Sequence, residues 1–302
     1  MLYAIGSKMY NETVIVFGDN NQLNGILTAP DIYKSDAAVL LLNSGSLHRV
    51  GPQRLYVNIA RDLGLAGFLS LRFDFSGLGE SFAIETNLPF KEQLKHEISW
   101  AMSYISSHKN IHKFIIIGIC SGAETAFHFA LNNPSIVGCI PINGIYLEGD
   151  EYVSVIDNAL ERTKVRYYKK NALNLSRWIK LLTGKSKVLS NRKLLVSKFK
   201  HLLTNQTSKV IEQKSEPQIL NRHRQAYNSK TKLFYIICEG SVAFDLFELL
   251  LKDWFKKENT SDHFKIKILA DTDHLFTLSY SQSILRHEIL DWMALYFYHD
   301  SE

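Results

Sequence analysis

The stretch KFIIIGICSGAETAFHFAL, residues 113–131, decides the fold. It begins with an isoleucine-rich run of strand length and ends, over Ala123–Leu131, in a helical pattern. Between the two, the sequence Gly-Ile-Cys-Ser-Gly puts Cys120 at the centre of a strand-to-helix turn. A nucleophile on such a turn needs small neighbours, because the backbone there is strained and closely packed. The pattern therefore predicts Cys120 as a nucleophile.

Two other interpretations of this turn stay open. The usual pattern is G-x-S-x-G, and the serine of this turn is Ser121. Its spacing argues against a nucleophilic role, because it follows the centre by one place, where the backbone N–H is expected to face a developing oxyanion. The second interpretation is that Cys120 is an inert buried cysteine in a glycine-rich turn. The strand before it and the helix after it favour the catalytic interpretation.

Outward from this turn, strands alternate with helices. Ala37–Leu42 is a continuous apolar run, as expected for a strand buried on both faces of a parallel sheet. Further strands are predicted at residues 13–17, 23–27, 67–73 and 138–142, and helices at residues 54–63 and 91–107. This alternation predicts an α/β fold with a mostly parallel sheet that helices cover on both faces.

An insertion interrupts this pattern. The sheet signal stops after about Gly149 and returns only at Lys232–Cys238 and Phe264–Leu269, which helical patterns at residues 244–255 and 282–298 follow. Helical patterns also occur between the two parts, at residues 153–162, 172–182 and 193–203. We therefore predict a core formed by residues 1–150 and 231–302, interrupted by a helical insertion, residues 151–230.

The insertion is strongly basic. The whole chain has a formal charge of +5, whereas residues 161–230 carry 18 Lys or Arg and 3 Glu, a net charge of +15. Such a segment is either a solvated helical surface or a docking face for a carrier protein, a phosphate-bearing substrate or a membrane surface. Its basic residues match no nucleic-acid module, so we expect no nucleic-acid partner.

The rest of the composition narrows the class of protein. The three cysteines, Cys120, Cys139 and Cys238, fit neither a disulfide framework nor a zinc spacing, and they indicate a reducing, cytoplasmic location. No stretch has 18 uncharged apolar residues, and residues 1–12 have no secretory pattern, so neither a membrane span nor a signal is expected. We expect no metal and no cofactor, because neither a ligand cluster nor a nucleotide-binding glycine pattern is present.

Two further loops supply candidate partners for Cys120. His274 lies in Asp271-Thr-Asp-His-Leu-Phe, a polar loop between the last strand and the last helix, where a general base is expected; the alternative is a surface histidine. The loop after Ala37–Leu42 carries a glycine and can turn a backbone N–H toward the nucleophile. We assign that N–H to Ser46, with Leu47 as the alternative, and expect the N–H of Ser121 to complete an oxyanion hole.

These residues together resemble the α/β-hydrolase superfamily, most closely the bacterial hydrolases related to serine aminopeptidases and exosortase-associated hydrolases. The resemblance is carried by Asn-Ser-Gly at 43–45, His-Arg-Val-Gly-Pro at 48–52, the loop at residues 72–81, the turn around Cys120 and the Asp-His pair at 273–274. It implies an α/β-hydrolase fold with a cap over the site, which the insertion would supply. We expect Asp74, in the 72–81 loop, to organise a tight turn rather than to act as a catalytic acid.

One position departs from that resemblance. The superfamily places a catalytic acid after the strand that follows the cap, where this chain has Ser241. Asp245 is the preferred candidate for the acid, ahead of Glu239, and a third interpretation is that no acid orients His274. A cysteine enzyme tolerates that loss better than a serine enzyme, because a thiol ionises far more easily beside an imidazolium.

The sequence therefore predicts a cysteine acyl enzyme with Cys120, His274 and Asp245 as catalytic residues. It would hydrolyse or transfer an acyl group from an ester or thioester, with the donor presented on an acyl carrier protein or on coenzyme A. One alternative is a binding protein that keeps the fold without catalysis. Another is a lipid-surface esterase whose lid is the aromatic and basic segment around residues 166–178.

Overall fold

The computed structural model describes residues 9–144, 146, 156, 159–166, 218–258 and 264–299. Its centre is an eight-stranded sheet with the order β1-β2-β4-β3-β5-β6-β7-β8. The strands are β1 (Tyr10–Phe17), β2 (Leu23–Pro30), β3 (Ala37–Leu42), β4 (Ser70–Phe73), β5 (Lys113–Ile119), β6 (Ile136–Ile142), β7 (Lys232–Cys238) and β8 (Phe264–Leu269). Strands β3 to β8 are mutually parallel, whereas β2 pairs antiparallel with both β1 and β4.

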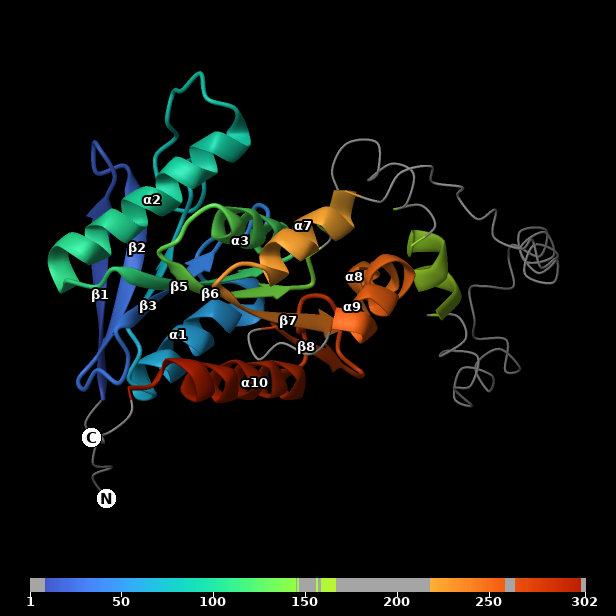
Figure 1. The fold of residues 1–302 in the computed structure, drawn as a ribbon. Coiled ribbons are helices and arrows are strands. Elements are labelled where there is room, and N and C mark those ends of the chain that lie inside the picture. The colour runs from blue at the N-terminus through green and yellow to red at the C-terminus, as the bar shows by residue number, and fades with distance from the viewer. Residues whose placement is uncertain are drawn as a thin grey trace, which may run out of the picture.

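Helices cover both faces of this sheet (Figure 1). One face carries α1 (Leu55–Leu65), which follows the short helix η1 (Pro52–Arg54), and α10 (Ser279–Phe297); the other carries α2 (Phe90–Lys109), α3 (Ser121–Leu131) and α7 (Gln218–Tyr227). Near the β7–β8 edge the chain forms α8 (Val242–Leu246), a π-helical turn η3 (Phe247–Leu251) and α9 (Lys252–Glu258). In the π turn the N–H of Lys252 donates to the carbonyl of Phe247, five residues back.

The sheet is stable because its central strands bury every side chain. All six residues of β3 are at most 1% exposed, and burial of one leucine or isoleucine side chain contributes roughly 1.5–3 kcal/mol. The sheet separates two apolar clusters, one beneath α1 and α10 and one beneath α2, α3, α7 and α9. The strand that the sequence marks as buried on both faces is therefore the middle of the core.

The order of the strands places the functional site. After β3 the chain moves to β4 on one side, and it then returns to β5 on the other side of β3. Loops that leave the carboxyl ends of β3 and β5 therefore diverge, and such a point is where open α/β sheets bind ligands. The loop at residues 43–54 and the turn at Cys120 both begin there.

The structure confirms the predicted α/β fold, with β3, β7 and β8 at the predicted bounds. Two elements differ from expectation. The helix predicted over residues 244–255 is divided by the π turn, and α7, within the range predicted for the cap, packs Ile219, His223 and Ala226 into the core beneath it. The other boundaries of the predicted cap, and the aromatic segment at residues 167–178, lie outside the described residues and stay predictions.

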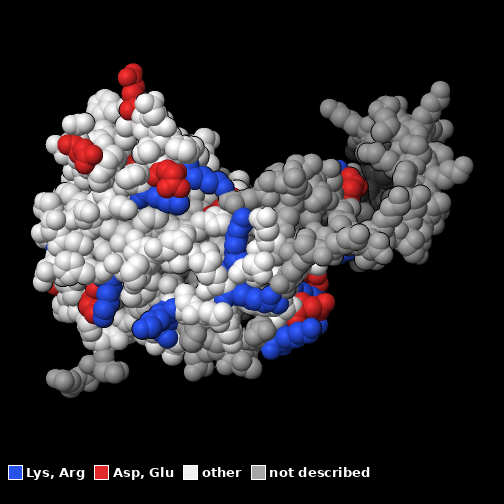
Figure 2. Space-filling model, turned by 45° about the horizontal axis from the view of Figure 1, so that its top comes forward, with Lys and Arg blue, Asp and Glu red and all other residues white. Residues whose placement is uncertain are grey.

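The face of the molecule in Figure 2 carries both basic and acidic side chains. Figure 2 shows basic and acidic side chains in small groups that lie beside one another on that face. Most of the basic insertion lies outside the described residues, so its charge is known only from the sequence. In the described part of the chain, no helix is both long enough and apolar enough to cross a membrane.

Candidate active site

Cys120 sits on a sharp turn with a strained backbone. Its φ and ψ are 57° and −121°, and it is the N-cap residue of α3. A positive φ is costly for a side chain with a Cβ and persists only where the surroundings enforce it. The N–H of Cys120 donates to the carbonyl of Ile142 (2.9 Å), which ties the turn to the end of β6. The thiol is half-buried at the carboxyl edge of the sheet.

The two glycines of the turn allow this geometry. A Cβ at Gly118 would lie 2.1 Å from the carbonyl oxygen of Gly122. A Cβ at Gly122 would lie 2.5 Å from the carbonyl oxygen of Asn43, in the loop after β3. Both separations are below any real contact of carbon with oxygen. Small residues are therefore required so that the turn can fold on itself and lie against the neighbouring loop.

Tyr56 links the carboxyl ends of β3 and β5, from which the loop and the turn begin. Its hydroxyl donates to the carbonyl of Leu42 (2.8 Å) and accepts from the N–H of Ile119 (3.1 Å). The side chain is fully buried, and burial raises the pKa of its phenol far above the usual range. The hydroxyl thus pairs two backbone groups at the ends of β3 and β5 that would otherwise be buried without partners.

The loop after β3 reaches the turn through Gly45. Its N–H donates to the hydroxyl of Ser121 (2.7 Å). The N–H of Leu47 is used inside the loop, where it donates to the carbonyl of Ser44 (3.0 Å). The backbone N–H that contacts the turn at Cys120 is therefore that of Gly45, one residue before the predicted Ser46. Ser46 stays a prediction for the oxyanion hole, and Gly45 is the donor that the sequence reasoning missed.

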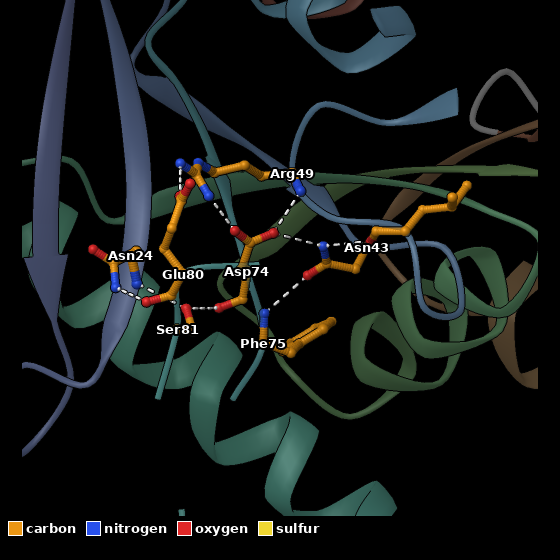
Figure 3. Close-up of polar contacts among 8 residues, drawn as sticks. Asn24, Asn43, Arg49, Asp74, Phe75, Glu80 and Ser81 are labelled. Carbon is orange, nitrogen blue, oxygen red and sulfur yellow. Dashed lines mark hydrogen bonds and ion pairs between the residues drawn. The ribbon is translucent and has the colours of Figure 1, made fainter. Parts of the chain in front are cut away.

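A buried carboxylate holds this loop in place (Figure 3). Asp74, at the end of β4, is inaccessible to solvent and pairs with the guanidinium of Arg49. The same carboxylate accepts from the N–H of Arg49 (2.5 Å) and from the side-chain amide of Asn43 (3.2 Å). The amide oxygen of Asn43 accepts in turn from the N–H of Phe75 (2.9 Å). Asp74 therefore organises a tight loop, as its sequence context indicates.

The loop after β4 is equally well tied. Arg49 also pairs with Glu80; burial opposes its charge, but the hydrogen bonds and charges of Asp74 and Glu80 outweigh burial and raise the pKa of the guanidinium. Ser81 donates to the carbonyl of Asp74 (2.7 Å). From α2, the buried Glu97 accepts from the N–H of Ser76 (2.8 Å) and from its hydroxyl. Two buried carboxylates, those of Asp74 and Glu97, thus fix the loop after β4.

His274 lies at the same edge, in the loop between β8 and α10. Its ring is half-buried, and the main-chain carbonyl of His274 accepts from the amide of Asn143 (3.1 Å). Asn143 follows β6 with a left-handed φ of 54° and is fully buried. Its amide also contacts the sulfur of Cys238 (3.2 Å), and its oxygen accepts from the N–H of Cys238 (2.7 Å). Asn143 therefore ties the His274 loop to the ends of β6 and β7.

The structure does not bring Asp245 to His274. One carboxylate oxygen of Asp245 accepts from the hydroxyl of Thr163, and the guanidinium of Arg166 pairs with both oxygens at 2.9–3.1 Å. The carboxylate of Asp245 is thus bound to the helical segment at residues 159–166, and Asp245 stays a prediction for the orienting acid. The sequence after β7 does not show which distant residues a carboxylate will contact, so the contacts of Asp245 with residues 159–166 were not predicted.

The other two positions considered for an acid are also occupied. The carboxylate of Glu239 accepts from the N–H of Asp271 (3.3 Å) and so supports the backbone of the His274 loop. Ser241 is buried and caps α8: its hydroxyl donates to the carbonyl of Cys238 (2.8 Å) and accepts from the N–H of Phe244 (3.3 Å). Ser241 therefore stabilises the helix start without contact to the imidazole.

Burial in the site favours the neutral forms of the Cys120 thiol and the His274 imidazole. Burial raises the pKa of the Cys120 thiol, the charge of Glu124 adds to that shift, and the N–H of Ser121 partly offsets it. Burial lowers the pKa of the His274 imidazole, and the charge of the neighbouring Asp273 partly offsets this. Both shifts disfavour a thiolate–imidazolium pair. Among the described residues, no hydrogen bond joins the thiol to the imidazole, and no carboxylate is hydrogen-bonded to the His274 ring.

No metal site accompanies these groups. In the ranges that the structure describes, no cluster of three or more His, Cys, Asp or Glu side chains is arranged to hold a metal ion.

Comparisons with known proteins agree with this fold. A family model described as the alpha/beta hydrolase fold matches residues 38–233, more than half of the 302-residue chain. An esterase of Pyrococcus furiosus superposes with a TM-score of 0.57 at 15% identity, over 96% of this chain and 92% of that chain. A dienelactone hydrolase of Anabaena variabilis gives 0.57 at 12% identity, over 96% of this chain and 100% of that one.

A third structure lacks a lid. It is a serine hydrolase of the same fold class from Xanthomonas campestris, described as being without a lid, with a TM-score of 0.54 at 12% identity and complete coverage of both chains. At such low identity these likenesses show the fold alone. No curated protein matches the sequence.

Proposed function

The chain belongs to the α/β-hydrolase fold family, and on that premise we propose that it is an acyl enzyme with Cys120 as nucleophile and His274 as general base. The observation that carries the proposal is the backbone of Cys120, with φ at 57° in a turn between Gly118 and Gly122. A strained turn that presents a thiol at the carboxyl edge of the sheet has no structural benefit of its own. It is the geometry that this fold uses to expose a nucleophile.

The proposed reaction begins with an ester or thioester at the carboxyl edge. His274 takes the proton of the Cys120 thiol as the sulfur attacks the acyl carbon, and the carbonyl oxygen becomes an oxyanion. Backbone N–H groups of Ser121 and of the loop after β3 stabilise that charge. When the tetrahedral intermediate collapses, the bond to the leaving group breaks, and the imidazolium returns its proton to the departing alcohol or thiol. The acyl group remains on Cys120 as a thioester.

The second half of the reaction releases the acyl group. His274 takes a proton from water, or from an amine or alcohol acceptor, as that nucleophile attacks the thioester carbon. The collapse expels the Cys120 sulfur, which recovers the proton from the imidazolium. Because a thioester reacts well with amines and thiols, transfer to an acceptor suits this nucleophile as well as hydrolysis. The acidic partner expected from the basic insertion, an acyl carrier protein or coenzyme A, would present the donor.

We further propose that Cys120 and His274 work as a dyad without a carboxylate partner. Asp245, Glu239 and Ser241 are each engaged elsewhere. Because burial disfavours both the thiolate and the imidazolium, the proposed proton transfer is concerted with attack. Catalytic hydrogen bonds are often long before substrate binds and tighten in the complex. The missing contact between thiol and imidazole is compatible with that sequence of events.

A second candidate function is a binding protein with the same fold and no catalysis. Its support is specific: Ser241 stands where the superfamily has an acid, and burial raises the pKa of the Cys120 thiol. Both features weaken a nucleophile. The unchanged glycines of the turn weigh against it, because a non-catalytic protein would gain stability by relaxing the strained backbone at Cys120.

Intact-protein mass spectrometry separates the two functions. The native chain, Cys120→Ala and Ser121→Ala are incubated with activated acetyl, butyryl and octanoyl esters and thioesters. The proposal expects one acyl adduct, absent only from Cys120→Ala, whose decay in water against added amine distinguishes hydrolysis from transfer. Absence of an adduct from all three proteins, at every chain length, contradicts the proposal and favours the binding protein.

A further inference from the structure

In the mechanism proposed above, only backbone N–H groups stabilise the oxyanion, and the side-chain hydroxyl of Ser121 has no role. Its oxygen accepts from the N–H of Gly45 at 2.7 Å, so one lone pair is used and the side chain is fixed over the turn. Ser121 is the first residue of α3, directly follows Cys120 and is exposed. A residue exposed at a helix start has no need of this contact for burial.

The proton of this hydroxyl remains available. A serine hydroxyl carries one donor and two lone pairs. Among the described residues, the one hydrogen bond of the Ser121 side chain is the one in which it accepts from Gly45. A hydroxyl that already accepts from an N–H is polarised by it and becomes a better donor. The contact with Gly45 therefore leaves the O–H of Ser121 without a described acceptor, next in the chain to Cys120.

We infer that the Ser121 hydroxyl is itself a donor of the oxyanion hole. It relays the N–H of Gly45: the hydroxyl accepts from that N–H and donates its own proton to the carbonyl oxygen of the substrate. Ser121 then supplies two donors to one oxyanion, its main-chain N–H and its side-chain O–H. No proton is transferred in this role; the hydroxyl only shifts its hydrogen bond from water to the oxyanion as the Cys120 sulfur attacks.

The inference rests on the proposed function but goes beyond it. It can be tested by whether removal of the hydroxyl slows or speeds acylation of Cys120. The opposite interpretation of the same contact is a plug: the hydroxyl fills the hole and must leave before substrate binds. Removal of the hydroxyl slows acylation if it is a donor and speeds acylation if it is a plug. Ser121→Ala therefore discriminates between the two by direction and not by size alone.

The experiment measures the single-turnover rate at which Cys120 is acylated by a p-nitrophenyl ester and by the matching thionoester. Loss of one oxyanion donor costs on the order of 100-fold in rate, so Ser121→Ala should be about 100-fold slower with the ester. The loss should be much smaller with the thionoester, because sulfur accepts hydrogen bonds weakly. Ser121→Thr keeps the hydroxyl and should recover most of the rate.

Two controls isolate the effect. Ser103→Ala removes an equally exposed hydroxyl from α2 and should acylate at the native rate; urea midpoints check that each variant is folded. Equal or faster acylation of Ser121→Ala than of the native chain, or an equal loss with ester and thionoester, overturns the inference while leaving Cys120 as nucleophile. An adduct that survives in Cys120→Ala, or none on the native chain, overturns the proposed function and this inference with it.

Discussion

The two halves of the site are built differently. On the oxyanion side, the loops after β3 and β4 are fixed by Asp74 and Glu97, two fully buried carboxylates that together accept hydrogen bonds from backbone and side chains. On the proposed proton-transfer side, Asn143 and Glu239 contact the backbone of the His274 loop, and among the described residues no carboxylate is hydrogen-bonded to the ring. The loops of the proposed oxyanion donors are thus tied by buried carboxylates, whereas the ring of the proposed base has no hydrogen-bonded carboxylate among the described residues.

This contrast fits the demands of each task. A donor must be in place before the oxyanion forms, because reorganisation during the reaction reduces its benefit. A general base must move its proton from the nucleophile to the leaving group and so benefits from some freedom of its ring. The following four variants or conditions test the contrast, from the largest expected effect to the smallest.

The largest effect is expected from His274→Ala. Loss of a general base costs roughly 100- to 10,000-fold in rate, and we expect acylation of Cys120 to slow by about 1,000-fold. Thermal unfolding should change little, because the contact to Asn143 uses the main-chain carbonyl of residue 274. A native acylation rate in this variant would show that the adjustable half of the site takes no part in proton transfer.

Asp74→Ala should cause the largest loss of stability. It leaves the guanidinium of Arg49, 15% exposed, without its main partner, and removal of one partner of a buried pair costs about 3–5 kcal/mol. Urea unfolding measures this change. The control is Asp36→Ala, whose ion pair with Lys113 is more than half exposed and should contribute less than about 1 kcal/mol. Equal losses in the two variants would mean that the oxyanion side is not rigidly held.

The pH dependence of alkylation tests the resting charge state. Because burial raises the pKa of the Cys120 thiol, its thiolate fraction should grow by about tenfold per pH unit from neutral pH upward, and the rate of iodoacetamide labelling with it. Burial lowers the pKa of His274, which disfavours an imidazolium that could hold a thiolate. A labelling rate that is already constant in mildly acidic solution would instead reveal a preformed ion pair.

The smallest effect on catalysis is expected from Asp245→Asn. An acid that orients a catalytic histidine contributes about 10,000-fold, whereas Asp245 pairs with Arg166 and Thr163. We expect acylation to change by less than about threefold, with a lower unfolding midpoint because Arg166 loses its partner. The matched Glu239→Gln should behave likewise in rate. A loss of 100-fold or more in either variant would restore that residue as the acid.

The sequence predicts a feature well where all the residues that define it lie in one continuous segment. Ala37–Leu42 and Lys232–Cys238 are predicted at their observed bounds, because an uninterrupted apolar run is long enough only for a buried strand. The turn at Cys120 is likewise marked locally, by two glycines at fixed spacing. The position of Asp74 in a glycine-containing loop was also sufficient to predict a structural role.

The sequence is less informative where partners come from distant segments. Ser46 and Gly45 are adjacent, and only the turn that uses the N–H of Leu47 decides which of them meets Ser121, 75 or 76 residues away. Asn143 carries one weak signal, an asparagine followed by glycine directly after a strand, which marks a left-handed residue but not its contact with His274. The partners of an acid such as Asp245 depend on packing between elements and leave no periodic trace.

The π turn at Phe247–Leu251 has a consequence for how the chain tolerates change in length. A hydrogen bond that spans five residues in place of four accommodates one surplus amino acid while the helix before and after it keeps its orientation. Deletion of one codon within this turn should therefore restore an ordinary α-helix and leave the aromatic face of α9, Trp254 and Phe255, against β8. A deletion inside a regular α-helix would instead rotate all the helical residues after it by about 100°, so this short segment is where single-residue gains and losses between relatives should accumulate.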